Sequence, residues 1–188
     1  ATGAEKLHIV PFSFSYDLIG DVKDYATVQA GATKRPESLS WFIGYLRGLR
    51  QPMGSIYFNF GEPVVLQSVP SPEEPRHLQQ VAFAVGVEAN RVTPITLPSM
   101  ICMMLLRSAP RALTRDELRS QVFAHVDWAK ERGIPLTSVL EEQDQDEITA
   151  LVEKMIGTGL ISRYDDGPEM VFALAAEQHG EAGYYRNT

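Results

Sequence analysis

Four histidines are the candidate general bases of this 188-residue sequence, because a neutral imidazole accepts a proton near pH 7. None of them stands in an HExxH-type metal-binding pair or beside a cysteine. The sequence also contains no Walker loop, no GxGxxG and no nucleophile elbow. Taken alone, each histidine is interpreted as a surface or strand-flanking residue. The four are His8, His77, His125 and His179.

The sequence also argues against disulfides, thiolate metal sites and membrane-spanning segments. Cys102 is the single cysteine, which excludes a disulfide within the chain and a metal site built on thiolates. No stretch approaches the roughly 20 apolar residues of a membrane-spanning helix. The opening letters ATGAEKLH have neither the basic nor the apolar region of a signal peptide. We expect a folded, soluble chain with no metal site and no membrane span.

The elements that would position a site in the first half are a strand, a helix and a second strand. Residues 7–17 alternate between a bulky apolar face and a small, mostly polar face, which is the period of a strand. Residues 37–50 carry an apolar stripe at helical spacing between two prolines, and residues 55–60 form the second strand. A crossover of this length ordinarily joins parallel strands, so the pattern predicts part of a larger parallel sheet.

The second strand ends at the triplet Gly61-Glu62-Pro63. Glycine adopts backbone angles closed to other residues, and proline has no N–H to donate to a neighbouring strand. The triplet therefore predicts a structural corner at which the chain leaves the sheet. A direct functional role for Glu62 is the less favoured alternative.

Helical signals dominate the second half. Ser71 and Thr114 each begin a capping box, and Asp144 begins a further helix that ends near Gly157. Two short strands about an Asp-Asp-Gly-Pro turn follow. Helix, short connector, helix and hairpin is the order of a winged-helix unit, which we place at residues 112–177. The expected domains are residues 1–68 and residues 69–188.

Charge is distributed unevenly along the chain. Residues 112–177 carry six Lys or Arg and fourteen Asp or Glu, so this region is strongly acidic. Contact with nucleic-acid phosphates needs clustered basic residues, and the predicted second helix of this unit offers only Lys154. A packing or docking module is therefore favoured over a nucleic-acid binder.

Three blocks follow one another along the chain: residues 10–17 read VPFSFSYD, residues 31–38 read GATKRPES, and residues 57–63 read YFNFGEP. In this order they resemble the glycerol-3-phosphate acyltransferase family of the long, membrane-associated bacterial and mitochondrial type. The first block is similar to the family's fourth motif, the second to its basic Gly-x-x-Lys-x-x-Glu-Ser segment, and the third to its Val-Asn-Phe-Gly-Glu-Pro stretch. The resemblance implies an α/β fold: part of an acyltransferase-type sheet, two strands with a crossover helix, followed by a mainly helical region.

The resemblance also implies an activity. Family members transfer a fatty acyl group from acyl-CoA or acyl carrier protein to the 1-hydroxyl of glycerol 3-phosphate, with a His-x-x-x-x-Asp pair as general base. No cofactor is implied besides this acyl donor. None of the four histidines here has an aspartate five positions on. We therefore expect no catalytic residue in this chain, inactivity when it is alone, and a catalytic part that precedes it in a longer enzyme.

Site roles follow from the resemblance, each beside a structural alternative. Pro11 matches a proline beside the family's substrate pocket, or it only shapes the sheet. Ser13, Ser15 and Tyr16 line the cleft, or Tyr16 is a packing residue at the strand end. A further basic pair attracts a phosphate of glycerol 3-phosphate or CoA, or is simply solvated. The pair is Lys34 and Arg35.

Two functional hypotheses remain. The first is a segment of the acyltransferase, with the parent protein at the cytoplasmic face of a membrane. Trp41 and Tyr45 near Arg47 and Arg50 suit peripheral lipid contact, or they cover a neighbouring element. The second is a non-catalytic docking or regulatory module of winged-helix-like shape.

Overall fold

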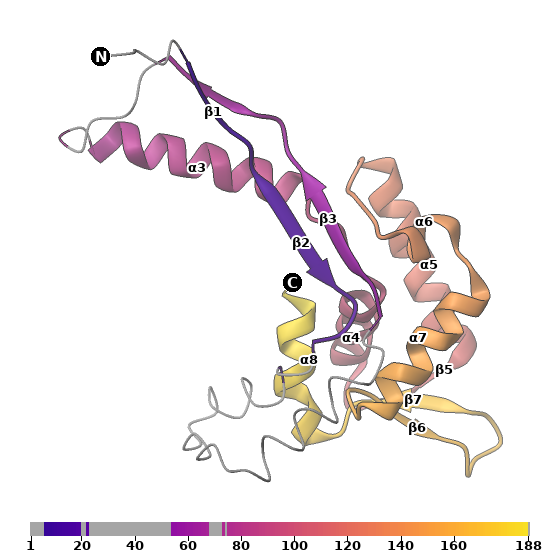
Figure 1. Ribbon diagram of the computed structural model, residues 1–188. Helices are drawn as coiled ribbons and strands as arrows, with labels where there is room; N and C mark the ends of the chain where they lie inside the picture. The colour runs from indigo at the N-terminus through magenta and orange to yellow at the C-terminus, as the bar shows by residue number, and fades with distance from the viewer. Residues whose placement is uncertain (1–5, 20–21, 23–53, 68–72, 74, 188) are drawn as a thin grey trace, which may run out of the picture. The chain divides into compact units, whose positions relative to one another are not determined.

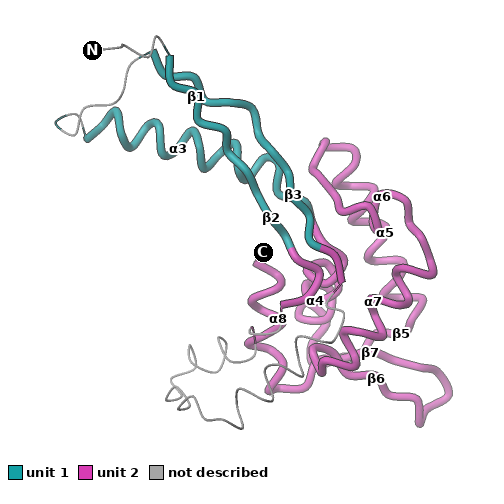
Figure 2. The backbone as a smooth tube through the Cα atoms, viewed as in Figure 1, with its two compact units in different colours: residues 1–15, 56–94 teal, residues 16–55, 95–188 magenta. Residues whose placement is uncertain are grey.

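The computed structural model describes residues 6–19, 22, 54–67, 73 and 75–187 (Figure 1). The chain divides into two compact units, which Figure 2 distinguishes by colour. Unit 1 comprises residues 1–15 and 56–94, and unit 2 comprises residues 16–55 and 95–188. Within unit 1, the long helix α3 (Pro75–Arg91) packs against strand β4 (Val64–Leu66), and the domain boundary expected at residue 68 stays a prediction. The described residues are mixed α/β, as predicted.

Unit 1 is built on two short strand pairs. Strand β1 (Leu7–Ile9) pairs with β4, and β2 (Phe12–Tyr16) pairs with β3 (Ile56–Phe60). Leu7 lies opposite Leu66 and Ile9 opposite Val64, so the β1–β4 pair is antiparallel. Parallel pairing was predicted for residues 7–17 and 55–60, which contain β2 and β3. Phe12 lies beside Phe60 and Phe14 beside Phe58, an antiparallel order, so the prediction was wrong: a long connection permits parallel pairing without requiring it. The predicted crossover helix, residues 37–50, lies outside the described residues.

Proline separates the two strand pairs. Pro11 falls between β1 and β2, and Pro63 falls between β3 and β4. Neither residue has an N–H to donate, so a regular ladder cannot run through these positions. The N–H of Gly61, after β3, donates to the carbonyl of Pro11, before β2, at 2.9 Å. This bond holds the two segments together between the two strand pairs.

The bulky face of β2 and β3 is solvent-exposed. The rings of Phe12 and Phe60 lie 6.4 Å apart across the strands, as do those of Phe14 and Phe58. Each of the four is more than half exposed, from 51% for Phe14 to 71% for Phe60. The sequence predicted the alternation, but which face is covered depends on the position of other elements.

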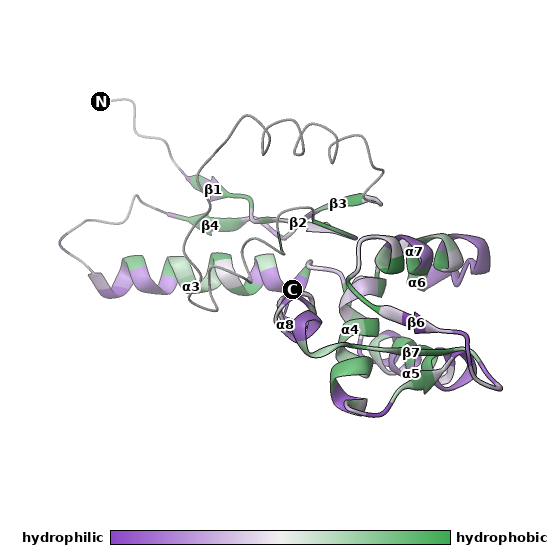
Figure 3. Ribbon diagram, turned by 90° about the horizontal axis from the view of Figure 1, so that it is seen from below, coloured by the Kyte–Doolittle hydropathy of each residue, from purple (hydrophilic) through white to green (hydrophobic). Residues whose placement is uncertain are grey.

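Helix α3 comes close to the backbone at Gly61, the residue that follows β3. Hydrophilic and hydrophobic residues alternate along this helix (Figure 3), and none of its side chains is fully buried. A Cβ at Gly61 would lie 3.1 Å from the backbone oxygen of Glu88 on α3. Glycine is therefore required here by the close approach of two backbones rather than by its φ angle.

Unit 2 is organised around α4 (Leu97–Ser108), whose apolar residues are buried except for Met103 and Leu106, which are partly buried. The helices packed on it are α5 (Arg115–Glu131), α7 (Gln145–Gly157) and α8 (His179–Arg186). The short elements are α6 (Ser138–Glu142) and the 3-10 helix η1 (Ala176–Gln178). Cys102 on α4 is fully buried, and burial raises its pKa to about 12. The sequence MICMMLL, residues 100–106, is apolar on all sides and therefore predicts a buried helix, which α4 confirms.

A small antiparallel sheet closes unit 2. Its strands are β5 (Leu113–Thr114), β6 (Ser162–Tyr164) and β7 (Val171–Ala173), in the spatial order β5-β7-β6. Ser162 lies opposite Ala173 and Tyr164 opposite Val171. The predicted hairpin is confirmed.

Two predicted helix starts are present with their side-chain caps. The Thr114 hydroxyl accepts from the N–H of Glu117, and the Glu117 carboxylate accepts from the N–H of Thr114, which is a complete capping box. Arg111 donates to the same carboxylate at 2.8 Å and lowers the pKa of Glu117. Asp144 caps α7 by accepting from the N–H groups of Asp146 and Glu147.

The segment after β2 joins the core of unit 2. Leu18 and Val22 are buried there, and the N–H of Ile19 donates to the hydroxyl of Tyr185 on α8 at 2.8 Å. The same hydroxyl lies 3.4 Å from the Ile19 carbonyl, to which it donates. Burial raises the pKa of Tyr185 to about 12, so the hydroxyl keeps its proton at neutral pH. None of the helices in the described ranges is long and apolar enough to span a bilayer.

We expect Gly61→Ala to lower the stability of the protein by about 1 kcal/mol, because the backbone of α3 at Glu88 must shift to admit the new methyl group. Thermal unfolding followed by circular dichroism measures this change. Gly86→Ala is the control. Gly86 lies on α3, the helix that carries Glu88, and nothing lies within 4 Å of a Cβ at this position. Alanine should raise stability there by about 0.5–1 kcal/mol. Equal effects of the two substitutions would contradict the close approach.

We expect Tyr185→Phe to cost about 2 kcal/mol, because it leaves the partly buried N–H of Ile19 without its acceptor. Urea unfolding measures the loss. The control is Tyr164→Phe, which removes a hydroxyl from a side chain that is 50% exposed and should change stability by less than about 0.5 kcal/mol. A cost for Tyr185→Phe no larger than that of the control would show that the hydrogen bond contributes nothing.

Candidate functional site

The predicted site residues of the strand lie on the less exposed face of β2. Pro11 is buried, and Ser13 and Ser15 are partly buried, whereas the neighbouring phenylalanines are exposed. The Ser13 hydroxyl lies 2.7 Å from the hydroxyl of Thr93. Thr93 also bonds the carbonyl of Ala89 at 2.8 Å. Because threonine has one hydroxyl proton, Ser13 supplies the proton of the contact between the two hydroxyls whenever Thr93 donates to Ala89.

Pro11 and Gly61 are brought together by a backbone hydrogen bond. This contact fits the sheet-shaping alternative for Pro11, and its role beside a substrate pocket stays a prediction. Glu62 and Pro63 are both exposed just past the bond. Their position agrees with a corner that leads the chain from β3 into β4.

A second cluster, in unit 2, involves an aspartate and a glycine to which no role was predicted. Asp17 is only 2% exposed, and its Oδ2 accepts from the N–H of Ser55 at 2.8 Å. Its own N–H donates to the Ser55 carbonyl at 3.1 Å. Gly54 has a φ of 95°, and a Cβ there would lie 2.6 Å from the Asp17 Cβ. Tyr16, partly buried, immediately precedes this cluster.

The sequence held weak signals for the residues that were missed. Asp17 ends the strand that carries the predicted site, and Gly54 comes immediately before Ser55, where the second strand was expected to begin. Thr93 has no such signal, because only tertiary structure brings the end of α3 to Ser13. Lys34 and Arg35, the predicted phosphate-binding pair, lie outside the described residues.

Two of the histidines and the cysteine can be placed in the structure. His8 is exposed on β1, and the ring of His125 bonds the Gln121 carbonyl one turn back on its own helix at 2.8 Å. The pKa of Cys102, about 12, keeps that thiol protonated and therefore a poor nucleophile. No group of three or more metal-ligating side chains occurs among the residues that the structure describes.

Comparison with known proteins identifies the family. Residues 25–188 match the family model described as "Glycerol-3-phosphate acyltransferase C-terminal region". The chain is 29% identical over 191 residues to proteins named "Putative acyltransferase plsB1" in Mycobacterium tuberculosis and Mycobacterium bovis, a match that covers 97% of this chain and 30% of each relative. It is 27% identical over 197 residues to the glycerol-3-phosphate acyltransferase of Haemophilus ducreyi, covering 96% of this chain and 24% of that protein.

The chain thus spans less than a third of the length of these curated relatives. The family model, in contrast, extends over most of the chain. Strand β3, the buried helix α4 and the acidic helical region all fall within the matched residues. The chain belongs to the glycerol-3-phosphate acyltransferase family, and the part it carries is that family's C-terminal region.

Proposed function

We propose that this chain is part of a glycerol-3-phosphate 1-O-acyltransferase. The enzyme transfers a fatty acyl group from acyl-CoA or acyl carrier protein to glycerol 3-phosphate, and the product is lysophosphatidic acid. The observation that carries the proposal is the family match over residues 25–188. The names of the mycobacterial and Haemophilus relatives, all of them acyltransferases, support it.

The proposed chemistry is general-base acyl transfer. A histidine oriented by an aspartate takes the proton of the substrate hydroxyl as that oxygen attacks the thioester carbonyl, and the thiol leaves. The residues five positions after the four histidines are Ser13, Ala82, Lys130 and Tyr184, so these 188 residues hold no His-x-x-x-x-Asp pair. The pair would come from another part of the enzyme, and this chain alone would be inactive. No cofactor beyond the acyl donor is proposed.

The proposed contribution of this chain to the reaction is substrate binding. Ser13 and Ser15 would present hydroxyls from the polar face of β2, and Lys34 with Arg35 would attract the phosphate of glycerol 3-phosphate. The contact between Ser13 and Thr93 at the end of α3 supports a fixed orientation for the Ser13 hydroxyl. A fixed hydroxyl costs less entropy to engage a substrate than a free one.

The second proposed function is docking by the acidic region. The order α4, β5, α5, α6, α7, β6, β7 and the strand order β5-β7-β6 support a winged-helix-like shape for residues 112–177. The excess of carboxylates there favours a protein or packing partner over nucleic acid.

The parent enzyme is proposed to work at the cytoplasmic face of a membrane, in peripheral contact with lipid.

The activity is tested by thiol release from palmitoyl-CoA in the presence of glycerol 3-phosphate. We expect no activity from the 188-residue chain and activity from the polypeptide extended upstream through the parent gene. Acyl carrier protein thioesters are the second donor to be assayed. If both polypeptides are folded and neither transfers an acyl group from either donor, the acyltransferase proposal is wrong.

The binding role of Ser13 is tested in the extended enzyme. If Ser13 contacts glycerol 3-phosphate, Ser13→Ala raises the KM for this substrate about tenfold, with little change in kcat. Thr93→Val is the matched control, because it removes the same hydroxyl contact and leaves the Ser13 hydroxyl in place. An equal rise in KM for both variants would assign Ser13 a structural role only. Lys34→Gln and Arg35→Gln should raise the same KM if this pair holds the phosphate.

A further inference from the structure

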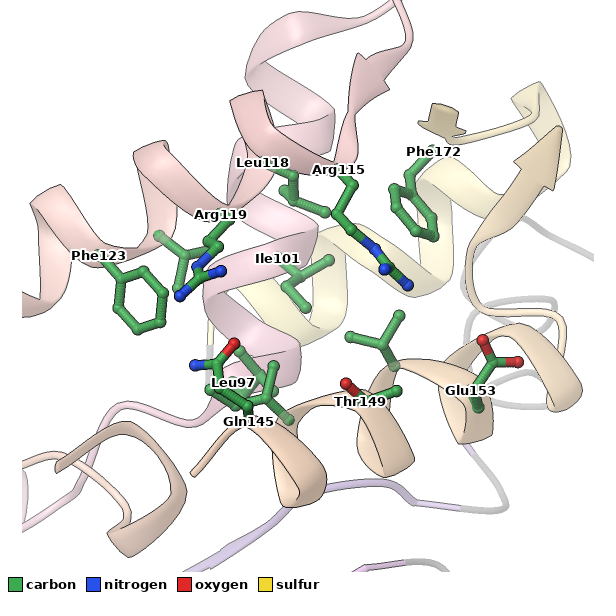
Figure 4. Close-up of a pocket in the computed structure, with 13 residues that line it drawn as sticks. Leu97, Ile101, Arg115, Leu118, Arg119, Phe123, Gln145, Thr149, Glu153 and Phe172 are labelled. Carbon is green, nitrogen blue, oxygen red and sulfur yellow. The ribbon is translucent and has the colours of Figure 1, made fainter. Parts of the chain in front are cut away.

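A cavity of about 150 Å³ opens between α4, α5 and α7 in unit 2 (Figure 4). Its floor is apolar and comes from all three helices. Leu97, Ile101, Leu118 and Val122 are buried there, and Ile148 and Val152 of α7 are partly buried beside them. The apolar floor of this cavity is large enough to accept a small apolar group.

Two arginines stand at the edge of this cavity. Arg115 and Arg119 are one turn apart on α5, and Figure 4 shows both guanidinium groups projecting towards the helix that carries Gln145, Thr149 and Glu153. The Arg119 guanidinium also lies 5.5 Å from the centre of the Phe123 ring. Both arginines are exposed, and within the described part of the chain neither is paired with a carboxylate.

The only carboxylate among the residues that line the cavity is already engaged. Glu153 on α7 accepts from Arg163 of β6 at 2.6 Å, so its negative charge is balanced by an arginine that does not line the cavity. The cavity therefore combines an apolar floor with a positive edge. This edge is unusual for its surroundings, since acidic residues outnumber basic ones by fourteen to six over residues 112–177.

We propose that this cavity binds a single-chain amphiphile with an anionic head. The alkyl chain would lie on the floor between α5 and α7, and the head, a phosphate or a carboxylate, would contact Arg115 and Arg119. Charge-assisted hydrogen bonds from arginine to these anions are strong and are favoured by guanidinium geometry. The inference does not depend on the proposed acyltransferase activity.

The size of the cavity limits how much of the chain it can enclose. A cavity of about 150 Å³ holds a group of the size of benzene, which corresponds to about six carbons. Each enclosed methylene should raise affinity about fourfold, and methylenes beyond the cavity should add little. Affinity is therefore expected to rise with chain length up to about six carbons and then to level off.

A small amphiphile fits this site better than an acidic helix of another protein. Asp146 and Glu147 lie at the start of α7, and the whole region is acidic. An acidic macromolecule would meet this repulsion over its full contact surface. A single anionic head would be placed only against the two arginines.

Calorimetric titration of the 188-residue chain tests the proposal. The ligands are butyl, hexyl and decyl phosphate, each below its critical micelle concentration, with decanoate as the carboxylate arm. Neutral decanol and cationic decyltrimethylammonium are the controls for the head group. We expect hexyl phosphate to bind about fifteenfold more tightly than butyl phosphate, decyl phosphate to resemble hexyl, and both control heads to bind more weakly. Comparison of decanoate with decyl phosphate distinguishes the two sources of negative charge.

Variants locate the binding to this cavity. Arg115→Gln and Arg119→Gln should each weaken decyl phosphate binding about tenfold and leave decanol unaffected. Arg132→Gln is the matched control, because Arg132 follows the same helix and stacks on Trp128 at 4.5 Å but does not line the cavity. Val152→Phe should fill the cavity and abolish binding, with an unchanged circular dichroism spectrum as evidence that the fold is retained.

Four results would overturn the proposal. These are no binding by any amphiphile, decanol binding as tightly as decyl phosphate, an equal loss of affinity in Arg132→Gln, or tight binding of an acidic amphipathic peptide where decyl phosphate does not bind. The last result would show that the cavity binds a protein partner instead. If Val152→Phe fails to fold, the two glutamine variants, whose changes lie at the exposed edge, still decide the outcome.

Discussion

The burial of α4 is the constraint on which unit 2 depends. A helix that is apolar around its whole circumference is stable in water only when other elements cover most of its surface, and only Met103 and Leu106 among the apolar residues of α4 stay partly exposed. Here α5, α7 and α8 pack on it, and Leu18 and Val22 from the segment after β2 join the same core. Segments from near both ends of the chain thus meet around this core. The N–H of Ile19 donates to the hydroxyl of Tyr185 on α8. The same burial makes Cys102 unreactive, because the thiolate form cannot be solvated there.

Unit 1 follows a different rule, set by proline and glycine. Two-stranded pairs are marginal by themselves, and those of unit 1 are interrupted where proline removes a donor. Helix α3 covers one face, and Gly61 permits the close approach of the two backbones. The candidate residues Pro11 and Ser13 are consequently engaged with Gly61 and Thr93. Their contacts are consistent with a shaped and rigid part of a larger site.

The described residues give the proposed roles their structural basis. No group of three or more metal-ligating side chains occurs among them, and burial keeps the thiol of Cys102 protonated. What these residues do offer is a defined surface: hydroxyls under α3, exposed phenylalanines on the strands of unit 1, and an arginine-edged apolar cavity in unit 2. The proposed substrate positioning and the proposed amphiphile binding both depend on these features, because geometry matters more in these roles than a single reactive group.

The sequence by itself determined the local structure of the second half. The capping box at Thr114, the cap at Asp144, the buried helix around Cys102 and the hairpin after residue 160 were all predictable, because each depends on interactions within a few residues or on the helical or strand period. The family blocks, and the absence of a His-x-x-x-x-Asp pair, were also readable from the sequence. Tertiary structure alone decided the antiparallel direction of β1 and β4, the exposure of the phenylalanine face and the partner of Ser13. It also decided that Arg115 and Arg119 meet the apolar residues of α7 around one cavity. These features join residues far apart in the chain, and periodicity and propensity carry no information about which distant faces will pack together.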